Sequence, residues 1–136
     1  EVILKAVKHA GWALLHCSEE LRNDREFVLE AIEQNGYVLQ DVSEELKNDR
    51  EVVLKAVESC GEVLKFASYE LKNDREVVLQ AVKNDPIYLQ FVSDEFKNDR
   101  EVVIQAVKQM QGWALEFASK ELQKDPEIRQ IAGLDE

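Results

Sequence analysis

The residues best suited to bind a metal lie near the start of the chain, at His9, His16 and Cys17. Imidazole and thiolate groups are ligands that zinc prefers, but this spacing fits no standard zinc site. The sequence repeats about every 25 residues, and later copies place Asp41, Phe66, Phe91 and Phe117 at the position of His16. The position of Cys17 is taken by Val42, Ala67, Val92 and Ala118. We therefore interpret Cys17 as a core residue, and we expect no metal and no cofactor.

Nucleophilic and acid–base catalysis find equally little support in the sequence. One serine recurs in every copy, at Ser18, Ser43, Ser68, Ser93 and Ser119, but no histidine recurs beside it. A serine nucleophile needs a neighbouring base and an orienting group, so five copies of one serine indicate a structural role. The carboxylate pairs Glu19–Glu20 and Glu44–Glu45 fall on predicted solvated turns. Because acid–base catalysis needs a buried carboxyl group with a raised pKa, we predict that the chain is not an enzyme.

Binding chemistry is carried by positions that vary while the rest of the copy stays fixed. One such column holds Trp12, Tyr37, Glu62, Ile87 and Trp113, and a second holds Glu19, Glu44, Tyr69, Asp94 and Lys120. Tyrosine and tryptophan are frequent anchors of protein interfaces. The predicted partner-binding residues are therefore Trp12, Tyr37, Tyr69, Ile87 and Trp113. The alternative, left open here, is that these rings cover the joints between neighbouring copies.

The charge balance constrains the partner. The chain has 28 acidic and 17 basic side chains and a net charge of −11, which disfavours nucleic acid as a partner. The second copy is the most acidic, with a predicted patch at Glu30, Glu33, Asp41, Glu44 and Glu45. This patch would attract a basic partner, or it would only keep the chain soluble.

Each copy predicts two helical segments. The units are residues 1–25, 26–50, 51–75, 76–100 and 101–125, followed by a C-terminal cap at 126–136. The first segment begins after an Asn-Asp-Arg-Glu motif and places Val53, Leu54, Ala56 and Val57 on one apolar face. Aspartate (Asp24, Asp49, Asp74 or Asp99) is the expected N-cap, and an alternative register makes Asn48 the cap and Glu51 its partner.

The second segment follows an abrupt join, at Gly11, Gly36, Gly61 and Gly112, and at Asn84-Asp85-Pro86 in the fourth copy. It places Leu39, Val42 and Leu46 at helical spacing, with Leu64, Ala67 and Leu71 as their equivalents. The recurring Ser-x-Glu is typical of a helix cap, so we expect the helix to kink or restart at the serine.

Segments this short are marginal as isolated helices, so the units must be stabilised by stacking on one another. The sequence therefore predicts an all-α solenoid of five 25-residue two-helix repeats plus a C-terminal capping helix. The chain starts inside a unit and without methionine, so we expect a fragment of a longer protein. Its N-terminal face, around Val2, Ile3 and Leu4, is a candidate surface for self-association.

Two observations bear on the cellular compartment of the protein. No apolar run reaches the roughly 20 residues that span a bilayer, so we expect no membrane partner. Two cysteines cannot form a disulfide framework, which favours a reducing compartment such as the cytoplasm.

The signature NDREVVLxAVxxxGxxLxxASxELKNDR, repeated without spacers, resembles a tandem helical repeat family catalogued as a domain of unknown function. The family occurs in protists and in amoeba-associated bacteria. The resemblance implies helical repeats in large proteins, some of them secreted effectors delivered into a host cytoplasm, and it supplies no catalytic residues. The chain departs from the family's unit at Asp85-Pro86 and at the residue inserted near Met110.

These observations favour a non-catalytic protein–protein interaction module built on an acidic helical scaffold. The alternative hypothesis is architectural: the repeats space a catalytic domain of the parent chain, or mediate self-association.

Overall fold

A computed structural model describes residues 19–134, and this part of the chain is helical with no strand. Its elements follow in chain order as α2 (Glu19–Arg22), α3 (Arg25–Gln34), η1 (Gly36–Asp41), α4 (Glu44–Lys47), α5 (Arg50–Ser59), η2 (Gly61–Phe66), α6 (Tyr69–Lys72), α7 (Arg75–Asn84), η3 (Pro86–Phe91), α8 (Asp94–Lys97), α9 (Arg100–Met110), α10 (Gly112–Leu115), α11 (Lys120–Gln123) and α12 (Pro126–Ile131). The elements labelled η are 3-10 helices.

Each long helix begins at an aspartate. The carboxylate of Asp49 accepts a hydrogen bond from the backbone N–H of Val52 at 3.2 Å, which satisfies one of the free donors of the first turn of α5. Asp24, Asp74, Asp99 and Asp125 cap α3, α7, α9 and α12 in the same way. The predicted aspartate cap is therefore confirmed, and the alternative cap at Asn48 is wrong.

The second predicted segment divides into two elements of different kinds. In the second, third and fourth repeats it is a six-residue 3-10 helix, whose tighter winding suits a short segment. The chain then passes through an extended residue (Val42, Ala67 or Val92) and restarts as a four-residue α-helix after the recurring serine. The restart is confirmed. Each of these repeats thus holds three helical elements, one more than the predicted pair.

The hydrophobic core is formed by the side chains of each element that face the neighbouring repeats. Ala56 and Val57 are fully buried, as are Val53 and their equivalents in the other long helices, whereas Leu54 is only partly buried. The predicted apolar positions of the second segment are also buried: Leu39, Val42, Leu46, Leu64, Ala67 and Leu71. One continuous hydrophobic cluster runs through all the described repeats, so each repeat is stabilised mainly by its neighbours.

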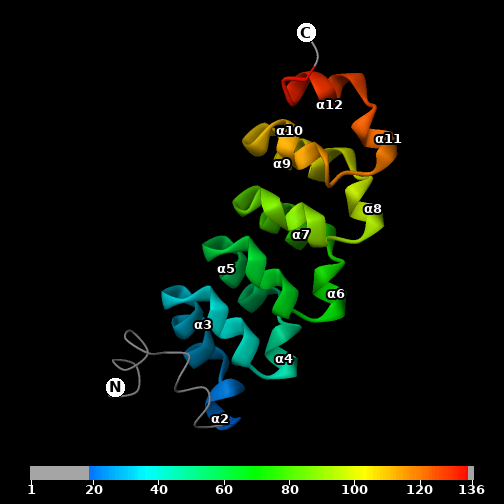
Figure 1. Cartoon of the computed structure of the whole chain (residues 1–136). Coiled ribbons are helices and arrows are strands. Elements are labelled where there is room, and N and C mark those ends of the chain that lie inside the picture. Colours follow the sequence, from blue (N-terminus) through cyan, green and yellow to red (C-terminus); the bar gives the residue numbers. More distant parts are fainter. Residues whose placement is uncertain (1–18, 135–136) are drawn as a thin grey trace.

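The repeats stack in chain order, which confirms the predicted solenoid (Figure 1). The long helices α3, α5, α7 and α9 form successive layers, and the short helices α4, α6, α8 and α11 follow one another along one side. Helix α12 covers the last layer. It buries Ile128 and Ala132 against that layer and leaves Gln130 exposed, as a capping helix requires.

None of the helices that the structure describes is long and apolar enough to cross a bilayer.

Candidate interaction surface

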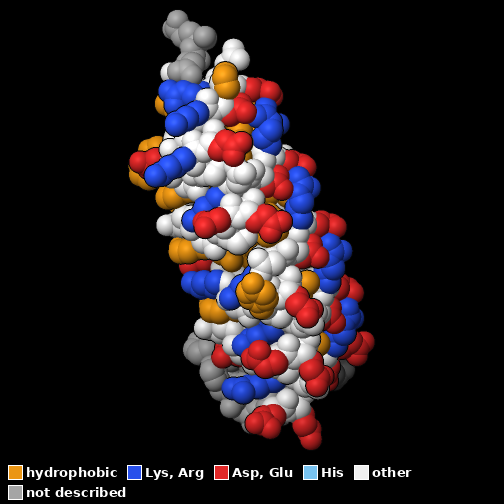
Figure 2. Space-filling view, turned by 90° about the vertical axis from the view of Figure 1, so that its right-hand side faces the viewer, with side chains coloured by type: hydrophobic (Ala, Val, Ile, Leu, Met, Phe, Trp, Pro, Cys, Tyr) orange, Lys and Arg blue, Asp and Glu red, His pale blue; other side chains and the backbone are white. Residues whose placement is uncertain are grey.

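A ladder of ion pairs joins the repeats along one side of the molecule. Arg75, at the start of α7, places Nε 2.7 Å from Oδ2 of Asp99 and Nη2 2.7 Å from Oε2 of Glu101, both at the start of the next long helix, α9. Three further arginines make the same pair of contacts: Arg25 with Asp49 and Glu51, Arg50 with Asp74 and Glu76, and Arg100 with Asp125 and Glu127. In Figure 2 basic and acidic side chains alternate from layer to layer along the right-hand side. The Asn-Asp-Arg-Glu motif therefore links repeats as well as starting helices.

The ladder shifts the pKa values of its members. The hydrogen bond from Arg75 holds the pKa of Asp99 below its usual 3.8, against the opposing effect of partial burial, and the N–H of Val102 adds to the lowering. Arg25 lowers the pKa of Asp49 in the same way. In return, the acids raise the pKa values of Arg25 and Arg75. Each of these aspartates is therefore ionised at neutral pH and serves both as helix cap and as arginine acceptor.

The recurring serine also links repeats. The hydroxyl of Ser68 donates to Oδ1 of Asn48 in the preceding repeat at 2.6 Å and accepts from the backbone N–H of Leu71 at 3.3 Å. Its own N–H donates to the carbonyl of Lys47 at 2.9 Å. Ser43 and Ser119 make the same three bonds. Ser93 makes none of the three in the described structure, so the junction between the third and fourth repeats lacks this link.

The glycine of the join is a point of close approach between repeats. A Cβ added to Gly61 would lie 2.2 Å from the carbonyl oxygen of Ala81 and 2.8 Å from Cβ of Asp85, both in the next repeat. A Cβ on Gly36 would meet Ser59 and Ala56 equally closely. The backbone of Gly61 needs no left-handed conformation, so contact with the next layer accounts for the glycine.

In the first variable column, one residue covers a joint between repeats, and others are exposed to solvent. Tyr37 is 38% exposed, and its hydroxyl donates to Oε2 of Glu62, the equivalent position of the next repeat, at 2.7 Å. Its ring packs edge-on against Phe66, also in the next repeat. The bond to Glu62 raises the pKa of the Tyr37 hydroxyl, with smaller contributions from Cys60 and burial. Tyr37 thus covers a joint between repeats.

Ile87 and Trp113 behave differently, because they project into solvent. Trp113 is 71% exposed and Ile87 is 47% exposed, and Phe91 beside them is 60% exposed. Ile87 and Phe91 lie on η3, which contacts the α10 helix that carries Trp113. We name these three residues the exposed apolar strip. Hydrophobic side chains recur down the left-hand side of Figure 2, opposite the ion-pair ladder. Phe91 is not among the predicted partner-binding residues, because its position (His16, Asp41, Phe66 and Phe117 in the other copies) is not in either of the two variable columns.

Tyr69 lies on a different part of the surface. It begins the short helix α6 and is 82% exposed, and its column supplies the first residue of each short helix. The structure therefore does not bring Tyr69 together with Ile87 and Trp113 on one element. Trp12, His9, His16, Cys17 and the predicted N-terminal face (Val2, Ile3 and Leu4) lie outside the described residues.

The acidic patch of the second repeat is spread over three elements. Glu30 and Glu33 lie on α3, Asp41 ends η1, and Glu44 and Glu45 begin α4. The four glutamates are exposed and Asp41 is partly buried. Glu44 pairs with Lys47 within its own helix at 3.3 Å.

Within residues 19–134 no group of three or more His, Cys, Asp or Glu side chains is placed to hold a metal ion.

Tyr88 is the one core residue with a phenol, and burial raises its pKa to about 12.

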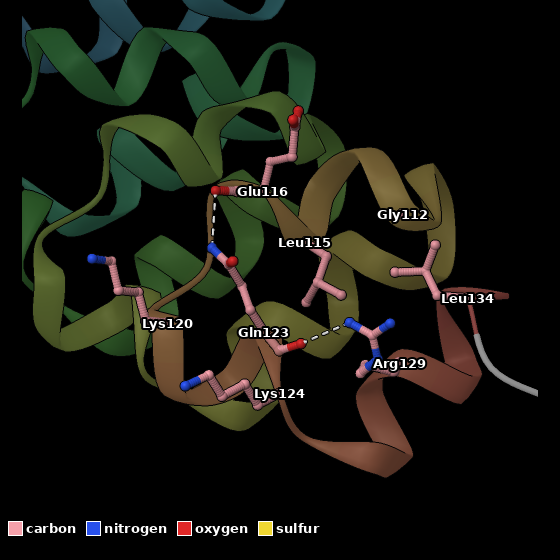
Figure 3. A pocket seen from close by; sticks show the side chains of 8 residues that line it. All are labelled: Gly112, Leu115, Glu116, Lys120, Gln123, Lys124, Arg129 and Leu134. Carbon is pink, nitrogen blue, oxygen red and sulfur yellow. Dashed lines mark hydrogen bonds between the residues drawn. The ribbon is translucent and has the colours of Figure 1, made fainter.

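A hollow of about 460 Å³ lies on the last repeat (Figure 3). It is lined by Leu115, Lys120, Lys124, Arg129 and Leu134, with Glu116 on one side. Gln123 holds the elements together, since its side-chain amide donates to the carbonyl of Ala118 at 2.9 Å and its backbone carbonyl accepts from Nη1 of Arg129 at 3.2 Å. We name this region the fifth-repeat groove.

Leu134 is held in the wall of the groove by the end of α12. The N–H of Leu134 donates to the carbonyl of Arg129, and that of Gly133 donates to Gln130, each at 3.0 Å. This pair of bonds is a Schellman motif, and Gly133 supplies its left-handed residue with φ 76°. The motif turns the chain back so that Leu134 lies against Gly112 (Figure 3).

The fold and these junctions define an all-α tandem-repeat solenoid. Comparison with protein families gave four overlapping matches to a domain of unknown function (DUF4116), at residues 1–47, 25–72, 49–87 and 74–123. The chain belongs to this family of tandem repeats. Neither a search of curated proteins nor one of solved structures gave a match.

Proposed function

We propose that this chain is a non-catalytic protein-binding module that uses the exposed apolar strip as its contact surface. The observation that carries the proposal is the exposure of Trp113, Phe91 and Ile87. The repeat does not need large apolar side chains there, because its other copies hold Tyr37 and Glu62 at the position of Ile87, and Asp41 at that of Phe91. Clustered exposed rings of this kind are frequent anchors of protein interfaces.

The rest of the surface supports this choice. The recurring polar residues, including the arginines, their acids and most of the serines, are occupied by links between repeats. A stacked core of this kind supplies a rigid support on which a binding strip can be changed without changing the fold.

Capture from cells by the full-length parent protein tests the proposal. The variant Phe91→Ser/Trp113→Ser should lose a partner that the unchanged protein retains, because it removes the two exposed rings of the strip. Since Phe91 also packs on the core residue Tyr88, with ring centroids 5.7 Å apart, the loss must occur with an unchanged circular dichroism spectrum. Tyr69→Ser is the matched control, since it removes an equally exposed ring from α6. Retention of every partner by the double variant, or equal loss with Tyr69→Ser, would contradict the assignment of the strip.

An architectural role is the second candidate, and the ion-pair ladder favours it. We propose in this case that the continuous core and the ladder make a rod that spaces other parts of the parent protein, or joins copies through an end. Small-angle scattering at several concentrations tests it. A rod-like particle whose mass rises with concentration supports self-association. A constant monomer mass contradicts self-association.

A further inference from the structure

The fifth-repeat groove consists of three neighbouring hollows. Beside the first lie one of about 510 Å³, lined by Met110, Trp113 and Leu134, and one of about 520 Å³, lined by Phe117, Lys97 and Asp94. All three hollows share Glu116 as a lining residue. Each is within the size range of a ligand site, and a chain of three such hollows suits an extended segment better than a compact molecule.

Four cations, Lys97, Lys120, Lys124 and Arg129, line the three hollows against two carboxylates, Asp94 and Glu116, although the chain as a whole carries a charge of −11. The first hollow is the most basic, with Lys120, Lys124 and Arg129 against Glu116. Arg129 is engaged with the carbonyl of Gln123, whereas Lys120 and Lys124 lie exposed at the rim (Figure 3). The two lysines are therefore available to a ligand's carboxylates.

The wall of the groove is apolar between these charges. Leu115 borders the hollow but is buried, at 4% exposure, so the accessible apolar surface is that of Leu134, which is half-exposed (Figure 3). Because the Schellman motif fixes Leu134, this wall exists before any ligand arrives, which lowers the entropic cost of binding.

Repulsion by the distant acidic repeats does not reach the groove at physiological salt. The acidic second repeat lies three layers away, roughly 27–30 Å at about 9–10 Å per helix layer. Exposed charges are screened over about 8 Å at 0.15 M salt. The field that a ligand meets is therefore set by nearby charges, which at the first hollow are Lys120, Lys124 and Arg129 against Glu116.

We propose that the fifth-repeat groove binds an acidic segment of a partner polypeptide, with an apolar side chain against Leu134 and carboxylates paired with Lys120 and Lys124. This inference rests on the proposed protein-binding function and adds the chemistry of the partner. Charge complementarity selects an acidic segment, and the apolar wall selects one that carries a leucine or an aromatic residue among its acids.

Fluorescence anisotropy with a labelled peptide of sequence EEDLFDEE tests the proposal. The chain should bind this peptide, bind KKRLFRKK at least tenfold more weakly, and lose affinity for the acidic peptide as salt rises from 50 to 500 mM. The variant Lys120→Glu/Lys124→Glu should weaken binding of the acidic peptide by about tenfold, since two attractive pairs become repulsive. Leu134→Ser should weaken it without changing its salt dependence.

The matched control is Lys55→Glu/Lys83→Glu, which makes the same change in net charge on the exposed faces of α5 and α7. It should leave binding within about threefold of that of the unchanged chain. No binding of EEDLFDEE, equal binding of the basic peptide, or equal loss in both lysine variants would overturn the proposal.

Sedimentation of the chain alone tests whether a second copy of the chain, and not a partner, fills the groove. A dimer that the Lys120→Glu/Lys124→Glu variant abolishes, and that the acidic peptide does not displace, would mean that a second copy fills the groove, and the peptide proposal would be wrong. Failure of the groove experiment with loss of a partner in the strip variants would remove only this inference and leave the proposed function standing.

Discussion

At the scale of single residues, the aspartate that starts each long helix has two tasks. Its carboxylate accepts the first-turn N–H groups of its own helix and the guanidinium of the preceding repeat's arginine. The next acid, such as Glu101 after Asp99, takes the other end of the same guanidinium. One short motif therefore fixes both the start of a helix and the position of that helix on its neighbour.

This double role predicts how stability depends on pH. The folded pKa values of Asp49, Asp74, Asp99 and Asp125 lie below the usual 3.8, so their stabilisation is fully present above about pH 5. It is lost as the pH falls through their folded pKa values, because the unfolded chain then binds protons that the folded chain does not. We expect the free energy of unfolding, measured with urea, to fall as the pH drops from 5 to 3.

Other acids act in the opposite direction, since protonation relieves repulsion in a chain with 28 acidic side chains. Arg75→Gln separates the two effects. It removes the main cause of the lowered pKa of Asp99 and leaves the other acids in place. Its unfolding free energy should therefore change less between pH 5 and 3 than that of the unchanged chain. An equal or steeper change would contradict the role of the ladder.

The glycines give a second prediction at this scale. Gly61→Ala should destabilise the chain by about 2–3 kcal/mol, because the added methyl group meets the backbone carbonyl of Ala81, which cannot move without shifting a helix. Gly112→Ala should cost about 1 kcal/mol or less, since its nearest neighbour is the end of the Leu134 side chain at 3.1 Å. Chemical unfolding of the two variants checks this, and equal losses would show that close packing of the layers is not the reason for the glycine.

At the scale of elements, the short helices lock the repeats together through serine. Ser68 caps α6 and bonds to Asn48 of the preceding repeat, whereas Ser93, at the start of α8, bonds to neither partner. Asn73, the residue equivalent to Asn48, donates instead to the carbonyl of Tyr69 in its own repeat. The recurring serine therefore contributes more to stability in one repeat than in another.

Replacing each of these serines by alanine measures its contribution to the free energy of unfolding. Ser68→Ala should lower the free energy of unfolding by about 1–2 kcal/mol, through loss of the cap and of the link to Asn48. Ser93→Ala should change it by less than about 0.5 kcal/mol, because no side-chain bond is lost. Similar losses in both variants, measured by urea unfolding, would contradict the difference between the two junctions.

The elements also show what the sequence could predict. Comparing copies located the aspartate caps, the buried face of the long helices and the restart at serine, because these depend on local spacing. The arginine ladder joins residues 24 to 27 positions apart and leaves no local pattern. One signal was present: Arg25, Arg50, Arg75 and Arg100 recur with the repeat although they are not apolar. The choice of a 3-10 helix after the glycine, and the greater exposure of Trp113 than of Tyr37, depend on packing between layers.

At the scale of the whole molecule, the layers form a rod with three kinds of surface. The ion-pair ladder runs along one side, hydrophobic side chains recur opposite it, and the basic groove lies at the C-terminal end (Figure 2, Figure 3). Both departures from the repeat, Pro86 and the residue inserted near Met110, lie in the fourth and fifth repeats, where η3 packs against α9. The two proposed binding surfaces lie in the same two repeats.

Stacking is the basis of all these features, since one hydrophobic core runs through the repeats that the structure describes. Circular dichroism of a synthetic peptide of residues 51–75, beside the 136-residue chain, measures this dependence most directly. The isolated unit should be largely unfolded in water, with no cooperative thermal transition, while the whole chain is helical and melts cooperatively. A stably helical 25-residue peptide with its own cooperative transition would contradict the account.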